Sequence, residues 1–213
     1  MNHYDYLNMN TIGQLQVIFS SVQNYVPYVL HILVLPWVVQ MVNALIGYKL
    51  NVLGILPRVP VGMLGIVFCP LLHGSFTHIF MNSFFFFALA LMVLLQGKQV
   101  FWVVVISVTL LSGLMVWLFA RRALHVGASG LVVGLWSYSV AMAYFNPSLT
   151  HVLAAAVGMF YFGTDLLASM LPQGKKVSVE GHIAGFIAGV ITASYFPVAK
   201  QAVSPLLPWL VSV

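Results

Sequence analysis

The chain is poor in charged residues and almost free of acidic ones. Charged residues make up 5% of its 213 residues, and Asp and Glu together number three. A soluble domain carries about 25% charged residues, so this composition excludes an ordinary water-soluble fold. The net charge of +5 is scattered, without the basic cluster that nucleic-acid binding needs. We therefore expect no nucleic acid among the partners.

Cysteine and the common metal-binding patterns are scarce too. Cys69 is the only cysteine, which excludes an internal disulfide and a cysteine-based metal site. The HExxH run of zinc proteases is missing. Asp165 is the only aspartate in an apolar span, whereas an intramembrane aspartyl protease needs two. Neither of these metal sites is therefore expected. The N-terminus also lacks the features of a secretory signal, so we expect it to be retained.

Apolar sequence, in contrast, is abundant at 62% of all residues. A helix that crosses the hydrocarbon core needs about 20 apolar residues, and these runs are too continuous for barrel strands, which alternate. The sequence predicts an all-α fold, a polytopic membrane helix bundle with six transmembrane helices. The expected spans are residues 28–46, 78–95, 100–120, 128–145, 149–171 and 179–196.

The six spans define a single membrane domain at residues 28–197. An N-terminal lead-in at 1–27 precedes it, and a short C-terminal tail at 198–213 follows it. Residues 47–77 are too long and too broken by proline and glycine for a minimal connection, so we expect an ordered loop lying partly in the interface. A small transporter would show paired broken helices or an internal repeat, and neither is visible.

Four polar side chains stand at the starts of alternate spans. His78 and Asn82 open the second span, Ser129 opens the fourth, and His182 opens the sixth. Because alternate spans run in the same direction, these ends meet at one membrane face. His78 and Asn82 are four residues apart and share one face of their helix. Polar groups at membrane depth are costly and usually functional, so the four predict a shared site.

These side chains suit acyl transfer by a serine nucleophile. Ser129 needs a base, and His182 on a parallel span can supply one. The developing oxyanion needs hydrogen-bond donors, for which the Ser129 N–H, the Asn82 amide and His78 are candidates. Spaced glycines would let the fourth and sixth spans approach closely. They are Gly130 and Gly134 on one span, and Gly185 and Gly189 on the other.

No acidic residue is placed as a third catalytic member. Glu180 lies two residues before His182 and faces away on a helix, so a Ser–His dyad is the simpler interpretation. Asp165 is expected to hydrogen-bond inside the bundle, and Asp5 lies in the lead-in. The remaining histidines of interest are expected to be structural; they are His73, His125 and His151.

Together these motifs resemble the rhomboid family. The sequence reads His73-Gly-Ser-Phe-Thr-His78-Ile-Phe-Met-Asn82, then Gly127-Ala-Ser129-Gly130, then Gly181-His182-Ile-Ala-Gly185-Phe-Ile-Ala-Gly189. The resemblance covers the second to the sixth span. It implies an intramembrane serine endopeptidase with Ser129 as nucleophile and His182 as general base. Asn82, His78 and the Ser129 amide would form the oxyanion hole, and Gly127 would shape the turn before the serine.

The resemblance also implies partners and a location, and it implies no other metal and no cofactor. The partners would be single-pass transmembrane protein substrates, cut at small residues in or near the membrane, together with membrane lipids. The protein would be multi-pass in the bacterial inner membrane, with a cytoplasmic lead-in and an active site toward the extracytoplasmic face. Loop charges favour the reverse orientation, because Lys and Arg concentrate on the active-site side. We follow the family, since Arg58 and the Arg121-Arg122 pair lie beside its motifs.

One departure from the family concerns the catalytic histidine. Val133 stands where the family often has an aromatic ring stacked on that histidine, so His182 is expected to be held less firmly. The segment 160–162 in the fifth span is the expected lateral gate. The alternative function is a non-enzymatic rhomboid-like protein that binds and escorts membrane helices. Such relatives typically lose the serine or the histidine, and both are present here.

Overall fold

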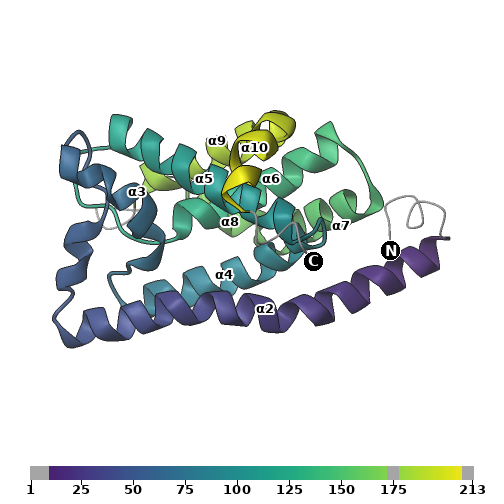
Figure 1. Cartoon of the computed structure of the whole chain (residues 1–213), viewed down its shortest axis with the longest axis horizontal. Helices are drawn as coiled ribbons and strands as arrows, with labels where there is room; N and C mark the ends of the chain where they lie inside the picture. Colours follow the sequence, from purple (N-terminus) through teal and green to yellow (C-terminus); the bar gives the residue numbers. More distant parts are fainter. Residues whose placement is uncertain (1–9, 172–177, 208–213) are drawn as a thin grey trace.

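The computed structural model describes residues 10–171 and 178–207 (Figure 1). Over these residues the chain is helical, apart from loops and one isolated bridge between Ile55 and His125. This confirms the all-α prediction. The apolar helices are α2 (Thr11–Leu45), α4 (Phe76–Leu94), α5 (Lys98–Phe119), α6 (Ser129–Phe145), the continuous set α7 (Leu149–Gly158), η4 (Met159–Gly163) and α8 (Thr164–Ala168), and α9 (Val179–Ser194).

These helices follow the predicted order, but not all have the length of a full span. Within the described residues, four are long and apolar enough to cross a membrane, namely α2, α4, α5 and the α7–α8 set. A fifth arises if α9 is joined to α10 (Phe196–Val203) across a bend of 93°. The remaining helix, α6, has 17 residues, of which ten are buried. A central helix surrounded by protein does not need to match the full thickness of the hydrocarbon.

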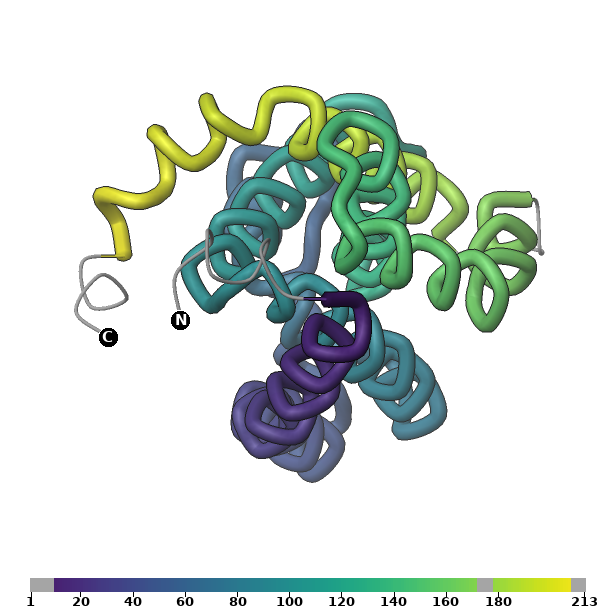
Figure 2. The backbone as a smooth tube through the Cα atoms, turned by 90° about the vertical axis from the view of Figure 1, so that its right-hand side faces the viewer, coloured from purple at the N-terminus to yellow at the C-terminus, as the bar shows by residue number. Residues whose placement is uncertain are grey.

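The first helix differs from its predicted bounds. It begins at Thr11, where the Asn10 side chain accepts a hydrogen bond from the Gly13 N–H at 2.8 Å, and it continues through Pro27 to Leu45. Much of the predicted lead-in is therefore helical, while residues 1–9 lie outside the described part. Proline is tolerated inside membrane helices, so the helix extends beyond the N-terminal end of the predicted span at residue 28. In Figure 2 this helix lies at the edge of the bundle.

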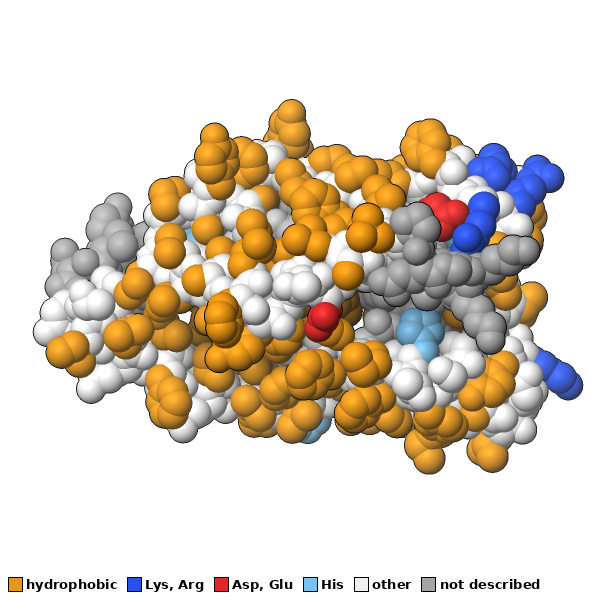
Figure 3. Space-filling view, turned by 180° about the vertical axis from the view of Figure 1, so that it is seen from behind, with side chains coloured by type: hydrophobic (Ala, Val, Ile, Leu, Met, Phe, Trp, Pro, Cys, Tyr) orange, Lys and Arg blue, Asp and Glu red, His pale blue; other side chains and the backbone are white. Residues whose placement is uncertain are grey.

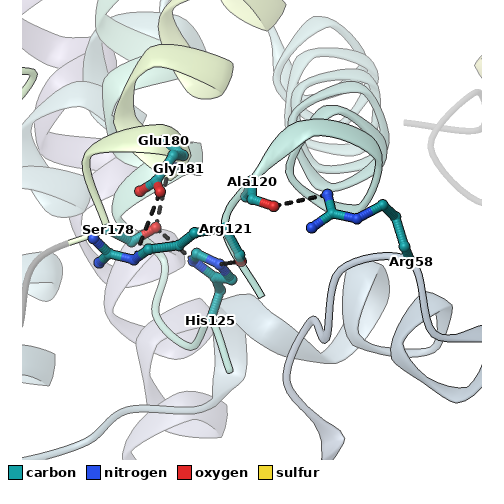
Figure 4. A network of polar contacts seen from close by, with 7 residues as sticks. All are labelled: Arg58, Ala120, Arg121, His125, Ser178, Glu180 and Gly181. Atoms are coloured by element: carbon teal, nitrogen blue, oxygen red, sulfur yellow. Dashed lines mark hydrogen bonds and ion pairs between the residues drawn. The ribbon is translucent and has the colours of Figure 1, made fainter. Parts of the chain in front are cut away.

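The predicted ordered loop between the first two spans folds into short helices. They are η1 (Lys49–Leu53), η2 (Pro60–Met63), α3 (Gly65–Phe68) and η3 (Cys69–Leu71). The loop is tied to the end of α5 by Arg58, whose Nη1 donates to the carbonyls of Leu118 at 3.0 Å and Ala120 at 2.8 Å (Figure 4). These are carbonyls that the helix end leaves without intrahelical donors, so the arginine caps α5.

The core is built around α6. Leu135 and Tyr138 of α6 are fully buried and pack with Leu89 of α4 and Phe101 of α5. On the far side, α9 packs along α6, and α10 then turns away to lie on α5, with η5 (Ser204–Leu206) after it (Figure 2). Part of the predicted tail is thus helical. The outer surface is largely hydrophobic, with Lys and Arg gathered at one end of the face in Figure 3.

Candidate active site

Ser129 is the first residue of α6, at the end of a tight turn. Gly127 has a φ of +120°, a backbone conformation that favours glycine, and Ala128 is the N-cap residue. The N–H groups of the first helical turn have no intrahelical acceptor. The turn therefore presents the Ser129 hydroxyl next to free backbone donors, as an acyl-transfer site requires.

His78 and Asn82 lie directly against this turn. A Cβ atom added at Gly127 would lie 2.6 Å from Cε1 of His78 and 3.5 Å from Nδ2 of Asn82. Only glycine leaves room for both side chains two residues before Ser129. The Asn82 Nδ2 is buried and has no hydrogen-bond partner within the described residues. It is a spare donor beside the serine, which is what an oxyanion hole needs.

Glycines bring α6 and α9 into backbone contact. A Cβ at Gly185 would lie 2.1 Å from the carbonyl oxygen of Gly130, and one at Gly189 would lie 2.2 Å from that of Gly134. No larger residue fits at this separation. The close approach sets the start of α9, with His182, beside the start of α6, with Ser129.

His182 lies in the first turn of α9 and is buried, with 8% of its surface exposed. Its Nδ1 is 2.7 Å from the carbonyl oxygen of Ser169, just after α8. Because a carbonyl only accepts, Nδ1 carries the hydrogen, and Nε2 keeps its lone pair as a base requires. Val133, at the position where the family often has an aromatic ring, is buried. The Ser169 carbonyl restrains the His182 imidazole in addition to whatever side-chain packing does. Because the acceptor is a main-chain carbonyl, no residue type in the sequence indicates this restraint.

The serine and the histidine are adjacent in the fold but are not bonded to each other. Within residues 10–171 and 178–207, the Ser129 hydroxyl and the His182 ring make no mutual hydrogen bond. Hydrogen bonds between catalytic groups are often long before substrate binds. The missing bond therefore does not exclude a serine–histidine pair.

A hydrogen-bonded clip joins the two segments that carry this pair (Figure 4). His125 Nε2 donates to the Arg121 carbonyl at 3.2 Å, so Nδ1 accepts from the Ser178 hydroxyl at 2.7 Å. Ser178 in turn caps α9 by accepting from the Gly181 N–H at 3.3 Å. His125 and Ser178 each precede a member of the pair by four residues. The structural role expected for His125 thus includes a link that sequence reasoning missed.

The acidic residues have different surroundings from those expected. Asp165 is exposed, so the prediction that it hydrogen-bonds inside the bundle is wrong. The π-helical turn η4 precedes it, and the extra residue in that turn shifts the side chains that follow around the helix. Glu180 is 3.6 Å from Nε of Arg121 and forms an ion pair there. Asp5 and the Lys175-Lys176 pair lie outside the described residues.

The thiol of Cys69 lies against the loop that leads to Ser129. Its Sγ donates to the carbonyls of His125 at 3.5 Å and Gly127 at 3.4 Å. Burial raises the pKa of this thiol to about 12, so Cys69 stays protonated and does not compete as a nucleophile. A small cavity of about 40 Å³ lies here, bounded by Cys69, Ser129 and Gly181 among others.

Comparisons with known proteins identify the family. The family model described as Rhomboid domain matches residues 61–198. An uncharacterized protein of Mycobacterium tuberculosis is 32% identical over 173 residues, which cover 78% of this chain and 72% of the relative. A protein of Acanthamoeba polyphaga mimivirus, provisionally named a rhomboid protein, is 28% identical over 138 residues, which cover 62% of this chain and 74% of the relative. With its apolar helices, the chain is a multi-pass integral membrane protein, and it belongs to the rhomboid family.

Proposed function

We propose that the protein is an intramembrane serine endopeptidase that hydrolyses peptide bonds in or near transmembrane segments of single-pass membrane proteins. The observation that carries the proposal is the His182 tautomer. Nδ1 donates to the Ser169 carbonyl, which leaves Nε2 as a base at the start of α9, beside the helix that begins with Ser129. His151 is held by a main-chain carbonyl in the same way, so the orientation of His182 supports the proposal through its place beside the Ser129 helix.

The proposed chemistry has two halves. In the first, Nε2 of His182 takes the proton from Ser129 Oγ while Oγ attacks the peptide carbonyl carbon. The C–N bond then breaks, and the same proton passes to the leaving amine. In the second, Nε2 takes a proton from water, which attacks the acyl-enzyme carbonyl. The bond from that carbon to Ser129 Oγ then breaks, the proton returns from Nε2 to Oγ, and the acid product is released.

The oxyanion formed in each half needs donors in place before the reaction. The Asn82 Nδ2, the Ser129 N–H and the His78 ring are proposed for this role. Support comes from their position around Gly127 and from the unpartnered state of Asn82 Nδ2. Preorganised donors in a site with little water stabilise the developing charge without reorganising.

A dyad is proposed rather than a triad. The nearest acidic residue along α9 is Glu180, which pairs with Arg121. The Ser169 carbonyl would orient His182 as the acidic residue of a triad does, although it cannot supply a full negative charge. The small cavity beside Ser129, of about 40 Å³, favours a substrate with a small side chain at the cleaved bond, since about 10–15 Å³ of such volume is enough for one water and this cavity holds only a few.

The proposed location is the bacterial inner membrane, with the active site toward the extracytoplasmic face. The loop charges that oppose this orientation have partners inside the protein: Arg58 caps α5 and Arg121 pairs with Glu180. Cations committed to such contacts are weaker signals of topology than free loop charges. The fifth span is the proposed lateral gate, because Phe160 and Tyr161 lie in its π-helical turn and are largely exposed.

The deciding experiment uses purified protein in detergent with a single-pass reporter substrate. Wild type should cut the reporter, and Ser129→Ala and His182→Ala should not. A fluorophosphonate probe should label wild type at Ser129 and leave Ser129→Ala unlabelled. Cleavage that survives Ser129→Ala would rule out the mechanism. Tight binding of the reporter without cleavage or labelling would favour a protein that only escorts membrane helices.

A further inference from the structure

A second and larger cavity shares Asn82 and Ala128 with the Ser129 site, but neither Ser129 nor His182 lines it. Its volume is about 410 Å³, and its walls come from α2, η3, α4, α5 and the start of α6. The lining is almost wholly apolar. This volume lies toward the low end of the range of about 300–1,000 Å³ for small-molecule sites, which are typically apolar with a few placed polar groups.

The cavity adjoins the lipid-facing surface. Three of its lining side chains are themselves largely exposed: Leu35 of α2 at 56%, Val67 of α3 at 59% and Leu110 of α5 at 45%. Leu35 and Leu110 are in the interior of long apolar helices, far from the loops. At that depth the surroundings are hydrocarbon, so a ligand enters from the bilayer.

Two buried polar side chains form one end of the cavity. His73 is 1% exposed, and neither ring nitrogen has a hydrogen-bond partner within the described residues, the Leu71 carbonyl lying outside hydrogen-bond geometry. Asn82 adds its unpartnered Nδ2. An unsatisfied buried polar group costs about 1–3 kcal/mol. Burial lowers the pKa of His73 to about 4, so the ring is neutral and has one N–H to donate.

The other end of the cavity is aromatic. Phe86 of α4 and Phe101 of α5 line it and meet edge to face, with ring centroids 6.4 Å apart. The lining residues of α5 run from Phe101 to Leu110, so the cavity extends along that helix by about 14 Å at 1.5 Å per residue. A site of this length with hydrogen-bond donors in its wall fits a single hydrocarbon chain ending in an acceptor.

We propose that this cavity binds one long-chain fatty acid from the bilayer. The chain lies between α2 and α5 and reaches Phe86 and Phe101, and a carboxyl oxygen accepts hydrogen bonds from the His73 N–H and the Asn82 amide. The two donors favour a ligand that has an acceptor oxygen, and a plain hydrocarbon has none. The volume suits one chain better than the two chains and glycerol of a phospholipid. Binding does not depend on the proposed proteolysis.

The test is photo-crosslinking of the full chain in detergent micelles with palmitic acid that carries a diazirine in mid-chain. Labelled peptides are mapped by mass spectrometry. We expect labels on residues 101–110 and 32–36, and at least fivefold less labelling when unlabelled palmitate is in excess. Ser129→Ala should label as wild type does, so that loss of proteolysis and loss of binding are told apart.

Matched tryptophan variants check that the cavity is the site. Leu110→Trp and Leu35→Trp add bulk at lining positions and should reduce labelling at least fivefold. The controls are Leu114→Trp and Val34→Trp, at positions that are 41% and 56% exposed and do not line the cavity. They should stay within twofold of wild type. Equal labelling of all four variants, or labels spread evenly over lipid-facing residues, would overturn the proposal.

The polar end is tested by changing the probe and the histidine. A diazirine-bearing hexadecane of equal length should label the cavity at least tenfold less than the acid. His73→Phe, which keeps the ring and removes its nitrogens, should bring the two probes to within about twofold in variants that unfold at the wild-type temperature. A diacyl phospholipid probe that labels the cavity as strongly as the acid would show a different occupant and refute the assignment.

Discussion

The imidazole of His182 is oriented by the main chain of Ser169, whose carbonyl oxygen lies 2.7 Å from Nδ1. In serine proteases with a triad, an aspartate side chain makes the corresponding contact. A backbone group cannot be removed by a side-chain substitution. The restraint on the His182 imidazole is thus built into the fold at the end of α8.

The first prediction follows from that contact. Ser169→Ala removes only a hydroxyl that donates to the Leu166 carbonyl, so turnover of a reporter substrate should stay within about threefold of wild type. Glu180→Gln, which removes the nearby carboxylate, should behave likewise. Replacing the aspartate of a triad lowers kcat by about 10⁴. A loss of that size in Glu180→Gln would identify a third catalytic member and refute the dyad.

The second prediction concerns the oxyanion donor. Asn82→Ala should lower kcat by about 10²–10³ with little change in KM, because one such donor contributes that much and acts mainly along the reaction path. The neighbouring Ser83→Ala is the control: it removes only the acceptor of the Trp37 indole N–H and should keep wild-type kcat. Kinetics in detergent separate the two parameters. An unchanged kcat in Asn82→Ala removes Asn82 from the oxyanion hole.

Much of this site can be predicted from the order and direction of the apolar runs. Spans two, four and six are parallel, so they must begin at the same membrane face. Asn82, Ser129 and His182 stand near the starts of these spans and therefore lie at that face. The structure then places the starts of α4, α6 and α9 together, and the glycine spacing explains how α6 and α9 touch.

Other features depend on groups that the one-letter sequence does not display. Every residue has a main-chain carbonyl, so only the fold distinguishes that of Ser169 as the one that contacts His182. The exposure of Asp165 depends on a π-helical turn, which breaks the regular α-helical spacing assumed in a sequence reading. Helix α2 runs through Pro27 because the local cost of a proline does not decide where a long membrane helix begins.

The third prediction tests the clip between His125 and Ser178. His125→Ala should lower turnover about tenfold, because the loop before Ser129 is then no longer tied to the cap of α9. The double variant with Ser178→Ala should be little worse than either single variant, since both remove one link. The control is His151→Ala, which removes a buried histidine bonded to the Asn146 carbonyl at the opposite end of α6. Additive effects of His125→Ala and Ser178→Ala would contradict a shared link.

The fourth prediction concerns helix contact. In Gly185→Ala the new methyl group would lie 2.1 Å from the Gly130 carbonyl oxygen, so α6 and α9 must separate. Overpacking of this kind costs about 1–3 kcal/mol, and turnover should fall at least tenfold because Ser129 and His182 move apart. Gly158→Ala is the matched control, since its methyl would approach only side-chain atoms, none closer than Trp136 Cδ1 at 3.3 Å. Thermal unfolding and turnover should both distinguish the two variants, and similar behaviour would contradict the role of the contact.

The last prediction concerns entry of the substrate helix. Phe162, in the π-helical turn of the fifth span, makes edge contacts with Phe85 at 5.5 Å and Phe84 at 6.3 Å between ring centroids. These rings join the fifth span to α4. If the span opens sideways, Phe162→Ala should raise the cleavage rate of a transmembrane reporter about threefold or more, while reaction with a small fluorophosphonate should not change. Val152→Ala, at a position of α7 that is 48% exposed and outside this cluster, should leave both rates unchanged. An equal gain in both reactions of Phe162→Ala would point to a change at Ser129 itself, and a loss of cleavage would rule out this contact as a latch.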